Sequence, residues 1–415
     1  MRRGALFALV LLVAGWALTL WVAPWSDESI NDLFVYRSFA GPVLHGSLPY
    51  REIAFEYPPL AAPAIVLPGL AGTAGETFRW AFALWTLGAA VGVVLLCGAI
   101  ARATGGDARL AMPGAALMPV LCGALVRTHF DLFPVALLLG GLLLLCRERP
   151  RAGLAVLALG GMTKAFPLVA VPVALAWLVS RGLRREAWQG ALACLAVMGV
   201  VAGAAVAVSP GGAADAVTYH LDRPVQIEST PALMLLGLDA AGFGDARTIA
   251  SHRSDGLLHP AADAVASLFA AGLVALVALL CACVGQRRAL AGKDPRGGRE
   301  LVIACLAAAL GFALFGKVLS PQFIIWALPL GALALAWRMH ALAASVALAA
   351  VLTQIEFPAR YFDVVAREPA AVGVVAARNL VLAAALGLCL RELLPGRRQQ
   401  ELLDPRRAPV AVGLD

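Results

Sequence analysis

Residues 4–32, GALFALVLLVAGWALTLWVAPWSDESIND, begin with an apolar run and end in a short acidic segment. The apolar run, residues 4–23, has about the 20 residues that an α-helix needs to cross the hydrocarbon core of a bilayer. Trp16, Trp21 and Trp25 gather toward its far end, as aromatic residues do at membrane interfaces. No small-residue cleavage site precedes the acidic turn, so the stretch predicts a retained membrane span and not a cleaved signal peptide.

The composition extends this prediction to the whole chain of 415 residues, of which 61% are hydrophobic and 14% charged. Soluble proteins carry about 25% charged residues. Further apolar runs long enough to cross a bilayer lie near residues 77–101, 110–126, 132–146, 188–208, 260–284, 300–316, 322–337, 340–356 and 370–390. Two shorter runs between 152 and 180, broken by Lys164 and Pro167, predict a helical hairpin in the membrane. The sequence therefore predicts an all-α polytopic integral membrane protein.

The number of spans depends on residues 58–70, which contain four prolines and are too short and broken for a clear span. Without this segment twelve spans remain, and the overall range is about 11–13. No internal repeat and no segment long enough for a soluble domain is present. We expect one transmembrane domain over 1–395 and a disordered cytoplasmic tail over 396–415.

The net charge of +7 comes from arginines that gather in a few short loops. These loops lie at residues 147–151, 181–186, 285–299 and 397–407. Such clustering is typical of cytoplasmic loops under the positive-inside rule, so it indicates orientation and excludes a nucleic-acid partner. Both termini are then cytoplasmic. The eight cysteines lie in or beside apolar runs, which predicts no disulfide framework; the one close pair, Cys281 and Cys283, is interpreted as two small hydrophobic residues.

With the inside fixed, the polar segments on the outside are residues 26–57, 127–131, 209–259, 317–322 and 361–369. In the first outer loop, 26–57, Ser29 to Asp32 has the spacing of a helix capping box and predicts a helix from Asn31 to Leu44. Asp32 and Tyr36 would share one face of it. The alternative for Asp32 is a carboxylate that only caps the helix.

Glu56 and Tyr57 stand before two prolines, and the alternative for them is a rigid turn. The long outer loop, 209–259, adds His220 and Arg223, which are uninformative by themselves.

Lysine is rare, with three residues against thirty arginines, and two of the three are placed at the outer boundary of the membrane. Lys164 and Lys317 each stand among apolar residues, where a cation is costly and suggests a functional site. The alternative is a lysine that reaches the headgroups. Arg127 and Asp131 form a compact group that would also be satisfied as a simple ion pair.

Carboxylates and cations at one depth fit the transfer of a sugar from a lipid phosphate. A carboxylate takes the proton of an acceptor hydroxyl. Cations stabilise the charge that grows on the departing phosphate. The sequence contains no Gly-rich phosphate loop, which agrees with a donor that is not a nucleotide.

An ordered set of motifs then resembles glycosyltransferase family 87, polyprenyl-phosphate-mannose-dependent α-mannosyltransferases of the GT-C superfamily. The motifs, between about residues 27 and 335, are NDLFVY (31–36), GSLPY (46–50), EYPPL (56–60), R-x3-D-x-F-P (127–134), KAFPL (164–168), Y-H-x2-R-P-x-Q-x-E-S (219–229) and KVLSPQF-x2-W-x2-P (317–329). The last third of the chain resembles the family only in hydropathy.

The resemblance implies a GT-C fold with a helical first outer loop and with Asp32 as general base. It implies inverting transfer of a sugar, most often mannose, from a polyprenyl-monophosphate donor to a glycolipid or glycan acceptor, outside a bacterial plasma membrane. Glu56 and Tyr57 would lie near a sugar; Lys317, Gln322, Lys164 and Arg127 are placed at the donor phosphate by charge and depth. Tyr36, Asp131, His220 and Arg223 complete the predicted substrate-binding set. No cofactor and no metal are expected.

Two other classes of function stay open. A transporter or flippase would place its charges near the midplane and often shows inverted repeats. A polysaccharide ligase or polymerase with a diphosphate-linked donor would need a strongly cationic long outer loop, whereas 209–259 has mixed signs. Arabinofuranose from a similar carrier is an alternative to mannose.

Overall fold

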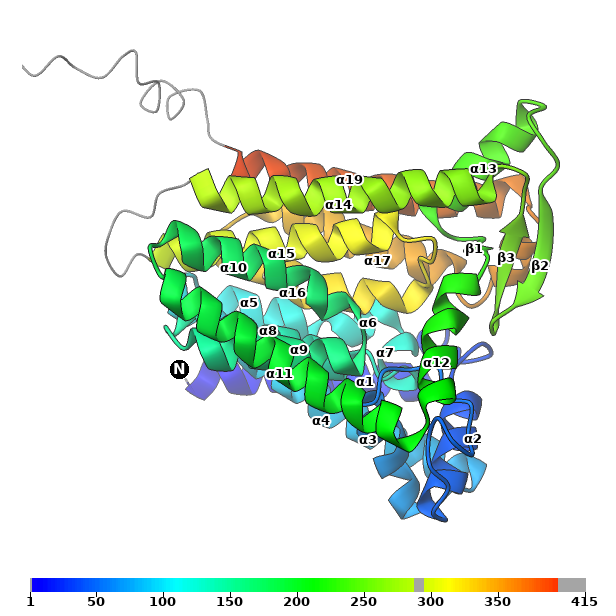
Figure 1. The fold of residues 1–415 in the computed structure, drawn as a ribbon, viewed down its shortest axis with the longest axis horizontal. Helices are drawn as coiled ribbons and strands as arrows, with labels where there is room; N and C mark the ends of the chain where they lie inside the picture. Colours follow the sequence, from blue (N-terminus) through cyan, green and yellow to red (C-terminus); the bar gives the residue numbers. More distant parts are fainter. Residues whose placement is uncertain (1, 287–294, 395–415) are drawn as a thin grey trace, which may run out of the picture.

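The computed structural model describes residues 2–286 and 295–394 as a bundle of helices that run side by side along its longest axis (Figure 1). The expected tail, 396–415, lies outside the described residues. Six described helices are long and apolar enough to cross a membrane. These are α1 (Arg2–Trp21), α4 (Gly75–Ala103), α11 (Arg184–Val208), α14 (Ala262–Gln286), α15 (Pro295–Phe315) and α19 (Pro369–Leu393).

Shorter or broken helical segments fill the bundle between the long ones. They are α5 (Ala108–Ala116) with α6 (Met118–Cys122) and α7 (Leu125–Thr128), α8 (Leu132–Cys146), α9 (Pro150–Thr163), η2 (Phe166–Val169) with α10 (Ala170–Ser180), η3 (Pro321–Phe323) with α16 (Ile324–Ala336), and α17 (His340–Glu356). The hairpin predicted between 152 and 180 is confirmed, because α9 ends at Thr163 and the helix resumes at Phe166. The all-helical polytopic membrane architecture is confirmed as well.

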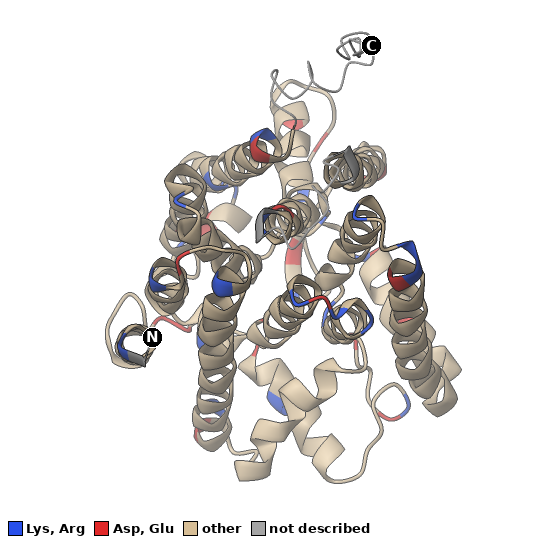
Figure 2. Cartoon of the chain, turned by 90° about the vertical axis from the view of Figure 1, so that its left-hand side faces the viewer, with Lys and Arg blue, Asp and Glu red and all other residues tan. Residues whose placement is uncertain are grey.

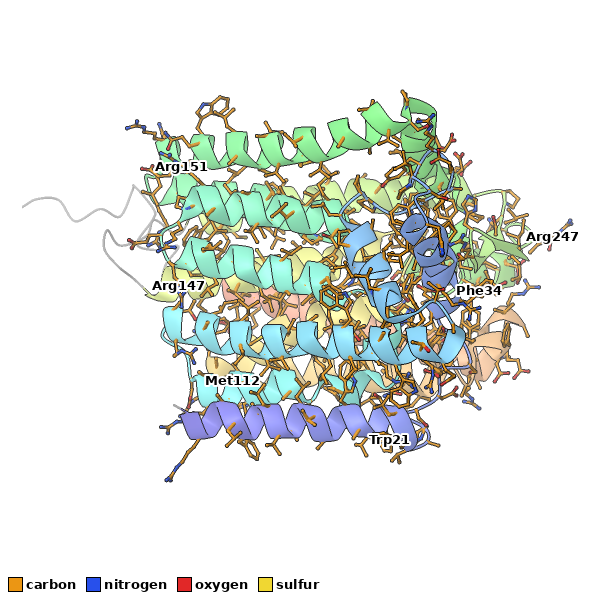
Figure 3. All side chains as sticks on the ribbon, turned by 90° about the horizontal axis from the view of Figure 1, so that it is seen from below. Trp21, Phe34, Met112, Arg147, Arg151 and Arg247 are labelled. Atoms are coloured by element: carbon orange, nitrogen blue, oxygen red, sulfur yellow. The ribbon has the colours of Figure 1, made fainter. Side chains whose placement is uncertain are left out.

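The two ends of the bundle differ in character. Loops rich in arginine lie at one end, which faces the viewer in Figure 2. Arg147 and Arg151 lie at that end in Figure 3, and Trp21, Phe34 and Arg247 lie at the opposite one. The opposite end carries the segments predicted to be outside, and we call it the outer end. That it faces away from the cytoplasm stays a prediction.

The first outer loop folds against the bundle through a second, aromatic core. Its helix α2 (Leu33–Leu44) packs on α3 (Ala61–Val66) and on η1 (Leu67–Ala71). Residues 58–70 therefore form two short helices at the outer end and do not cross. Tyr36, Phe39 and Tyr57 of this loop make edge-to-face ring contacts with one another or with Phe130, which lies between α7 and α8.

The long outer loop contains structure that the sequence analysis did not predict. After α12 (Pro210–Asp222), a sheet of order β1-β3-β2 forms from β1 (Val225–Gln226), β2 (Arg247–Ser251) and β3 (Ser254–Leu258), all antiparallel. Helix α13 (Thr230–Ala240) lies between β1 and β2, and α18 (Tyr361–Val365) follows later in the chain. His252 and Arg253 join β2 to β3 with φ of 52° and 55°. A two-residue hairpin turn with positive φ at both positions usually contains Asn-Gly. Because His252 and Arg253 occupy these positions, the turn is not predictable from the sequence.

The main core lies in the middle of the bundle around α15 and α16. In the apolar stretch of α15, 78% of the residues are buried, whereas in that of α11 only 11% are buried. The apolar face of α11 is therefore free to contact lipid. None of the eight cysteines forms a disulfide bond.

Candidate functional site

A cavity of about 890 Å³ opens at the outer end, between the two outer loops and the turn that follows α15. Most of the predicted site residues line it: Asp32, Glu56, Tyr57, Lys164, His220, Arg223, Lys317 and Gln322. They come from segments up to 290 positions apart in the chain (322 minus 32), so only the fold brings them together. Tyr36, Arg127 and Asp131 do not line it.

Asp32 stands at the N-cap position of α2, but its side chain makes no capping hydrogen bond. The side chain of Asn31 accepts the backbone N–H of Leu33 instead, at 2.9 Å. The interpretation of Asp32 as a simple capping carboxylate is therefore wrong. Its Oδ2 accepts the hydroxyl of Tyr36 at 3.1 Å, and the carboxylate is left at the cavity wall.

His129 is the second partner of Asp32, with Nε2 3.5 Å from Oδ2. The other ring nitrogen, Nδ1, lies 3.2 Å from the carbonyl oxygen of Leu125, which can only accept a hydrogen bond. A proton on Nδ1 would serve this oxygen, and Nε2 faces the carboxylate of Asp32. His129 stands between Arg127 and Asp131 in the chain and was not among the predicted site residues.

Glu56 is buried at the cavity wall and is held by an arginine from the β2–β3 turn. Nη1 of Arg253 donates to Oε1 of Glu56 at 2.6 Å, and the guanidinium lies over the ring of Phe39. Burial raises the pKa of the Glu56 carboxyl, and the charge of Arg253 opposes that rise. Arg253 was missed because nothing in the sequence of the hairpin points toward Glu56.

His220 contacts the same loop, since its Nε2 lies 2.9 Å from the carbonyl oxygen of Glu56. Burial lowers the pKa of the His220 imidazole below its ordinary value of 6.5. The neutral ring with a proton on Nε2 donates this bond. Glu56 thus connects the first outer loop to two parts of the long outer loop, α12 and the β2–β3 turn.

Lys164 does not reach for the headgroups; its side chain is 17% exposed and is enclosed by rings. Its ammonium lies 2.7 Å from Oδ1 of Asp131 and within 6 Å of the ring centroids of Phe130, Phe323 and Trp326. Asp131 itself is fully buried behind the cavity wall. Asp131 influences the cavity by fixing the position of the Lys164 ammonium.

Arg127 was predicted at the donor phosphate, with an ion pair to Asp131 as the alternative. Arg127 instead binds Glu28 and donates from Nε to the carbonyl oxygen of Thr19 at 2.8 Å. It is 1% exposed and lies outside the cavity lining, so the structure provides no path from its guanidinium to a ligand there. The alternative pairing is also wrong, because Asp131 pairs with Lys164. Arg127 fixes the outer end of α1.

The turn after α15 is tied to β1 by a polar cluster. The backbone N–H of Gln226 donates to the carbonyl oxygen of Lys317, and its Oε1 accepts the N–H of Leu319, each at 2.8 Å. Its Nε2 donates to Glu228, which is fully buried beside Arg378 of α19. The cluster fixes the backbone of the turn at Lys317 and Leu319, a role that the motif around residues 226–229 did not reveal.

The ammonium of Lys317 donates to the carbonyl oxygen of Leu221 at 2.5 Å and stays partly exposed. Its burial lowers the pKa of Lys317, and the nearby carboxylate of Asp222 opposes this. Arg223 donates from Nη2 to Ser254 at 2.7 Å, while its Nε has no partner among the described residues. Both cations therefore keep donors for a ligand.

The cavity has a polar and an apolar part. The polar part joins Asp32 and Glu56 to Lys164, Arg223 and Lys317. The apolar part is formed by Phe166, Phe312, Phe323, Trp326 and Phe357. Such a site can take a proton at Asp32, hold an anion at the cations and accept an apolar chain. No group of three His, Cys, Asp or Glu residues in the described part of the chain is arranged to hold a metal, and independence from metal stays a prediction.

No model of a protein family matches the sequence, and no curated protein matches it significantly. Among solved structures, the chain is similar to the apo form of the Archaeoglobus fulgidus oligosaccharyltransferase, with 15% identity and a TM-score of 0.44 over 98% of this chain and 58% of that one. For the same enzyme tethered to an acceptor peptide with the NVT sequon, the values are 13%, 0.40, 97% and 58%. The chain therefore spans about 58% of the length of the protein that it matches. These values transfer no activity to this chain, and the resemblance to family 87 stays a prediction.

Proposed function

We propose that the chain is a membrane glycosyltransferase of the GT-C type. It moves a sugar, mannose by its resemblance to family 87, from a polyprenyl monophosphate to a glycolipid or glycan acceptor at the outer end. The observation that carries the proposal is the convergence of Asp32, Lys164, Arg223 and Lys317 on one cavity at the predicted membrane surface. A carboxylate and cations in that place match what transfer from a lipid phosphate requires.

In the proposed reaction, the carboxylate of Asp32 takes the proton of an acceptor hydroxyl. The acceptor oxygen forms a bond to the anomeric carbon as the bond from that carbon to the phosphate oxygen breaks. The bonding electrons leave with the polyprenyl phosphate, whose charge changes from one negative to two. A single displacement inverts the anomeric centre, so a β-linked donor gives an α-linked product.

The cations stabilise the negative charge that grows on the leaving phosphate. Lys164 lines the cavity from the end of α9 and Arg223 from the end of α12. The ring contacts of Lys164 keep its ammonium in place before the reaction begins. The apolar part of the cavity around Phe323 and Trp326 would accept the first units of the polyprenyl chain. No nucleotide and no cofactor enter this reaction.

The proposal is tested with membranes that contain the wild-type chain or its Asp32→Asn variant. They are incubated with radiolabelled polyprenyl-phosphate mannose or arabinofuranose and a total lipid-glycan extract. We expect label from one donor to enter the glycan fraction in wild type, with a rate about 10²–10⁴ times lower for Asp32→Asn. Asp27→Asn, a neighbouring outer carboxylate bonded to the backbone of Ser29, is the matched control and should transfer normally.

Equal transfer by Asp32→Asn and wild type would remove Asp32 from the mechanism. Label that crosses the membrane while still attached to its carrier would favour the flippase. If neither monophosphate donor is used and a polyprenyl-diphosphate-linked sugar, offered in a parallel incubation, is transferred, the ligase or polymerase is favoured. Chromatography of the labelled lipid distinguishes the transfer outcomes, and a change in the access of a membrane-impermeant reagent to the labelled carrier detects crossing.

A further inference from the structure

Residues 129–131, which join α7 to α8, carry partners for two residues of the cavity. Asp131 binds the ammonium of Lys164 at 2.7 Å. His129 is 3% exposed and lines the cavity itself, and its Nε2 lies 3.5 Å from Oδ2 of Asp32. The same short segment therefore contacts both the proposed general base and a cation proposed to act on the leaving phosphate.

The contacts of the Asp32 carboxylate fall on one of its two oxygens. The hydroxyl of Tyr36 donates to Oδ2 at 3.1 Å, and the ring of His129 faces the same atom. Among the residues that the structure describes, Oδ1 has no partner, and the side chain is 33% exposed at the cavity wall. Oδ1 is therefore the oxygen that is left for the proton of an acceptor hydroxyl.

The contact between His129 and Asp32 requires a proton. A bare Nε2 and a carboxylate oxygen offer only lone pairs to each other, so their approach is favourable only with a proton between them. On Nε2, that proton leaves the carboxylate ionised, as a general base has to be. Two states of the ring have a proton on Nε2, the cation and one neutral tautomer.

The surroundings of Nδ1 accommodate both of these states. The carbonyl oxygen of Leu125 lies 3.2 Å from Nδ1 and accepts its proton when the ring is a cation. Oγ1 of Thr128 lies 3.0 Å away, and its hydroxyl can donate to Nδ1 when the ring is neutral. In either state, Nε2 of His129 is a donor that faces Oδ2 of Asp32.

We propose that His129 is a positioning residue for the general base Asp32, an inference that rests on the proposed function. His129 and Tyr36 together hold Oδ2, so the carboxylate is kept from rotating and Oδ1 stays toward the acceptor hydroxyl. In the transfer step, the proton of that hydroxyl moves to Oδ1, while the protons on Nε2 and on Tyr36 stay in place. The negative charge that the carboxylate loses appears on the leaving phosphate.

Two substitutions separate the two nitrogens of the ring. In His129→Gln the amide nitrogen reaches about as far as Nε2 and can donate to Oδ2 of Asp32. In His129→Asn the amide nitrogen reaches only about as far as Nδ1, so the variant keeps a donor for Leu125 and loses the one for Asp32. A purely structural role of the ring would therefore favour the Asn variant, and a positioning role favours the Gln variant.

The test measures kcat and KM for transfer by the purified full-length chain in lipid nanodiscs. The donors are radiolabelled polyprenyl-phosphate mannose and arabinofuranose, with the lipid-glycan extract as acceptor. We expect kcat of His129→Asn to fall about 10–100-fold with KM nearly unchanged, because a base displaced by about 1 Å slows the step without weakening binding. His129→Gln should recover most of the lost kcat. Thermal unfolding of each variant shows that it is folded at the temperature of the assay.

His45→Asn is the matched control. His45 is exposed at the end of α2, and its Nδ1 lies 2.7 Å from the carbonyl oxygen of Gly41. Nδ1 of His129 likewise contacts the carbonyl oxygen four residues earlier. Within the described part of the chain, His45 makes no ion pair with a carboxylate, so its substitution should leave kcat unchanged.

A second measurement does not depend on transfer. In a chain labelled with ¹⁵N-histidine, the Nε2 resonance of His129 is assigned by its loss in His129→Gln. We expect Asp32→Asn to shift this resonance, because the group that faces Nε2 loses its charge. Asp27→Asn, which changes a carboxylate bonded to the backbone of Ser29, should leave the resonance unchanged.

Three results would overturn the positioning role. These are equal kcat for His129→Asn and His129→Gln, a loss for His129→Asn that lies in KM alone, and a His129 resonance that does not change in Asp32→Asn. Failure of the proposed function has a different signature. Label then stays on both monophosphate donors with wild type, or Asp32→Asn transfers normally, while the resonance of His129 still responds to Asp32→Asn.

Discussion

Asp131 and Lys164 form an ion pair with 2.7 Å between Oδ1 and Nζ, and the indole Nε1 of Trp326 donates to the same oxygen at 2.5 Å. These contacts join the beginning of α8, the end of α9 and the beginning of α16. Asp131 is fully buried, and its Oδ2 has no partner in the described part of the chain. The pair therefore gives the cavity a cation whose position is fixed by a carboxylate that never reaches the ligand.

Removing either partner of this pair should destabilise the protein. Lys164→Met keeps the length of the side chain but leaves the buried carboxylate of Asp131 uncompensated. We expect the free energy of unfolding to fall by about 3–5 kcal/mol, measured by unfolding the detergent-solubilised protein in mixed micelles of increasing SDS content. Transfer activity should fall with it.

The double variant Asp131→Asn with Lys164→Met separates stability from activity. With both charges removed, most of the lost stability should return, because no unpaired charge is left in the core. Transfer should stay low, since the cation at the cavity is still missing. Recovery of both properties would contradict a role for Lys164 at the leaving phosphate.

A second prediction concerns Arg253, which closes the β2–β3 turn over Glu56. Arg253→Gln removes the ion pair with Glu56 and the contact with Phe39, so these two contacts no longer connect the turn to the first outer loop. We expect kcat/KM for transfer to fall about 10–100-fold, mostly through KM, as steady-state kinetics with the labelled donor will show.

Arg51→Gln is the matched control for this change, because Arg51 lies in the first outer loop and its ion pair within the described part of the chain is with exposed Glu52. Its kinetics should stay within about twofold of wild type. An equal loss in both variants would show that charge at the outer end matters in general and that the contact between Arg253 and Glu56 does not.

The sequence was sufficient to predict the helical membrane architecture and the place of Asp32, because both depend on local patterns. Hydropathy determines which segments lie in a bilayer, and the NDLFVY motif places an acidic residue directly before a short helix. Partners were harder to predict. Arg127 stands four positions from Asp131, yet it binds Glu28, 99 positions away. Its Nε also donates to Thr19 near the end of α1, so the fold brings the segment after α1 beside Arg127.

Residues that act from the β-sheet could not be found from the sequence at all. Arg253 depends on a hairpin whose turn, His252–Arg253, lacks the residues that usually announce one. Gln226 of β1 likewise reaches its partner only through the fold, since its Oε1 accepts the N–H of Leu319, 93 positions away. These relationships come from tertiary packing, which neither spacing nor hydropathy encodes.

A third prediction uses His220, whose pKa is lowered by burial and by the nearby charge of Arg223. The folded state favours the neutral ring, so its contribution to stability is present above pH 6.5 and is lost as the pH falls through the lowered pKa. His220→Gln keeps a donor for the carbonyl of Glu56 and does not titrate. Thermal unfolding between pH 7.5 and 5 should show a smaller loss of stability for the variant than for wild type, and identical slopes would contradict the prediction.

The last prediction concerns Tyr36, whose hydroxyl donates to Oδ2 of Asp32 at 3.1 Å from within the aromatic core. Burial raises the pKa of the Tyr36 phenol, so the hydroxyl stays a donor across the working pH range. Tyr36→Phe keeps the ring packing and removes only this donor. We expect the free energy of unfolding to fall by about 0.5–1.5 kcal/mol. We also expect kcat to fall about tenfold, because Asp32 can then rotate away from the acceptor hydroxyl. Tyr50→Phe, which removes a hydrogen bond of the same loop to the carbonyl oxygen of Tyr57, is the control for a loss of stability alone. If kcat falls equally in both variants, the loop as a whole sets the rate, and the bond between Tyr36 and Asp32 has no special part in it.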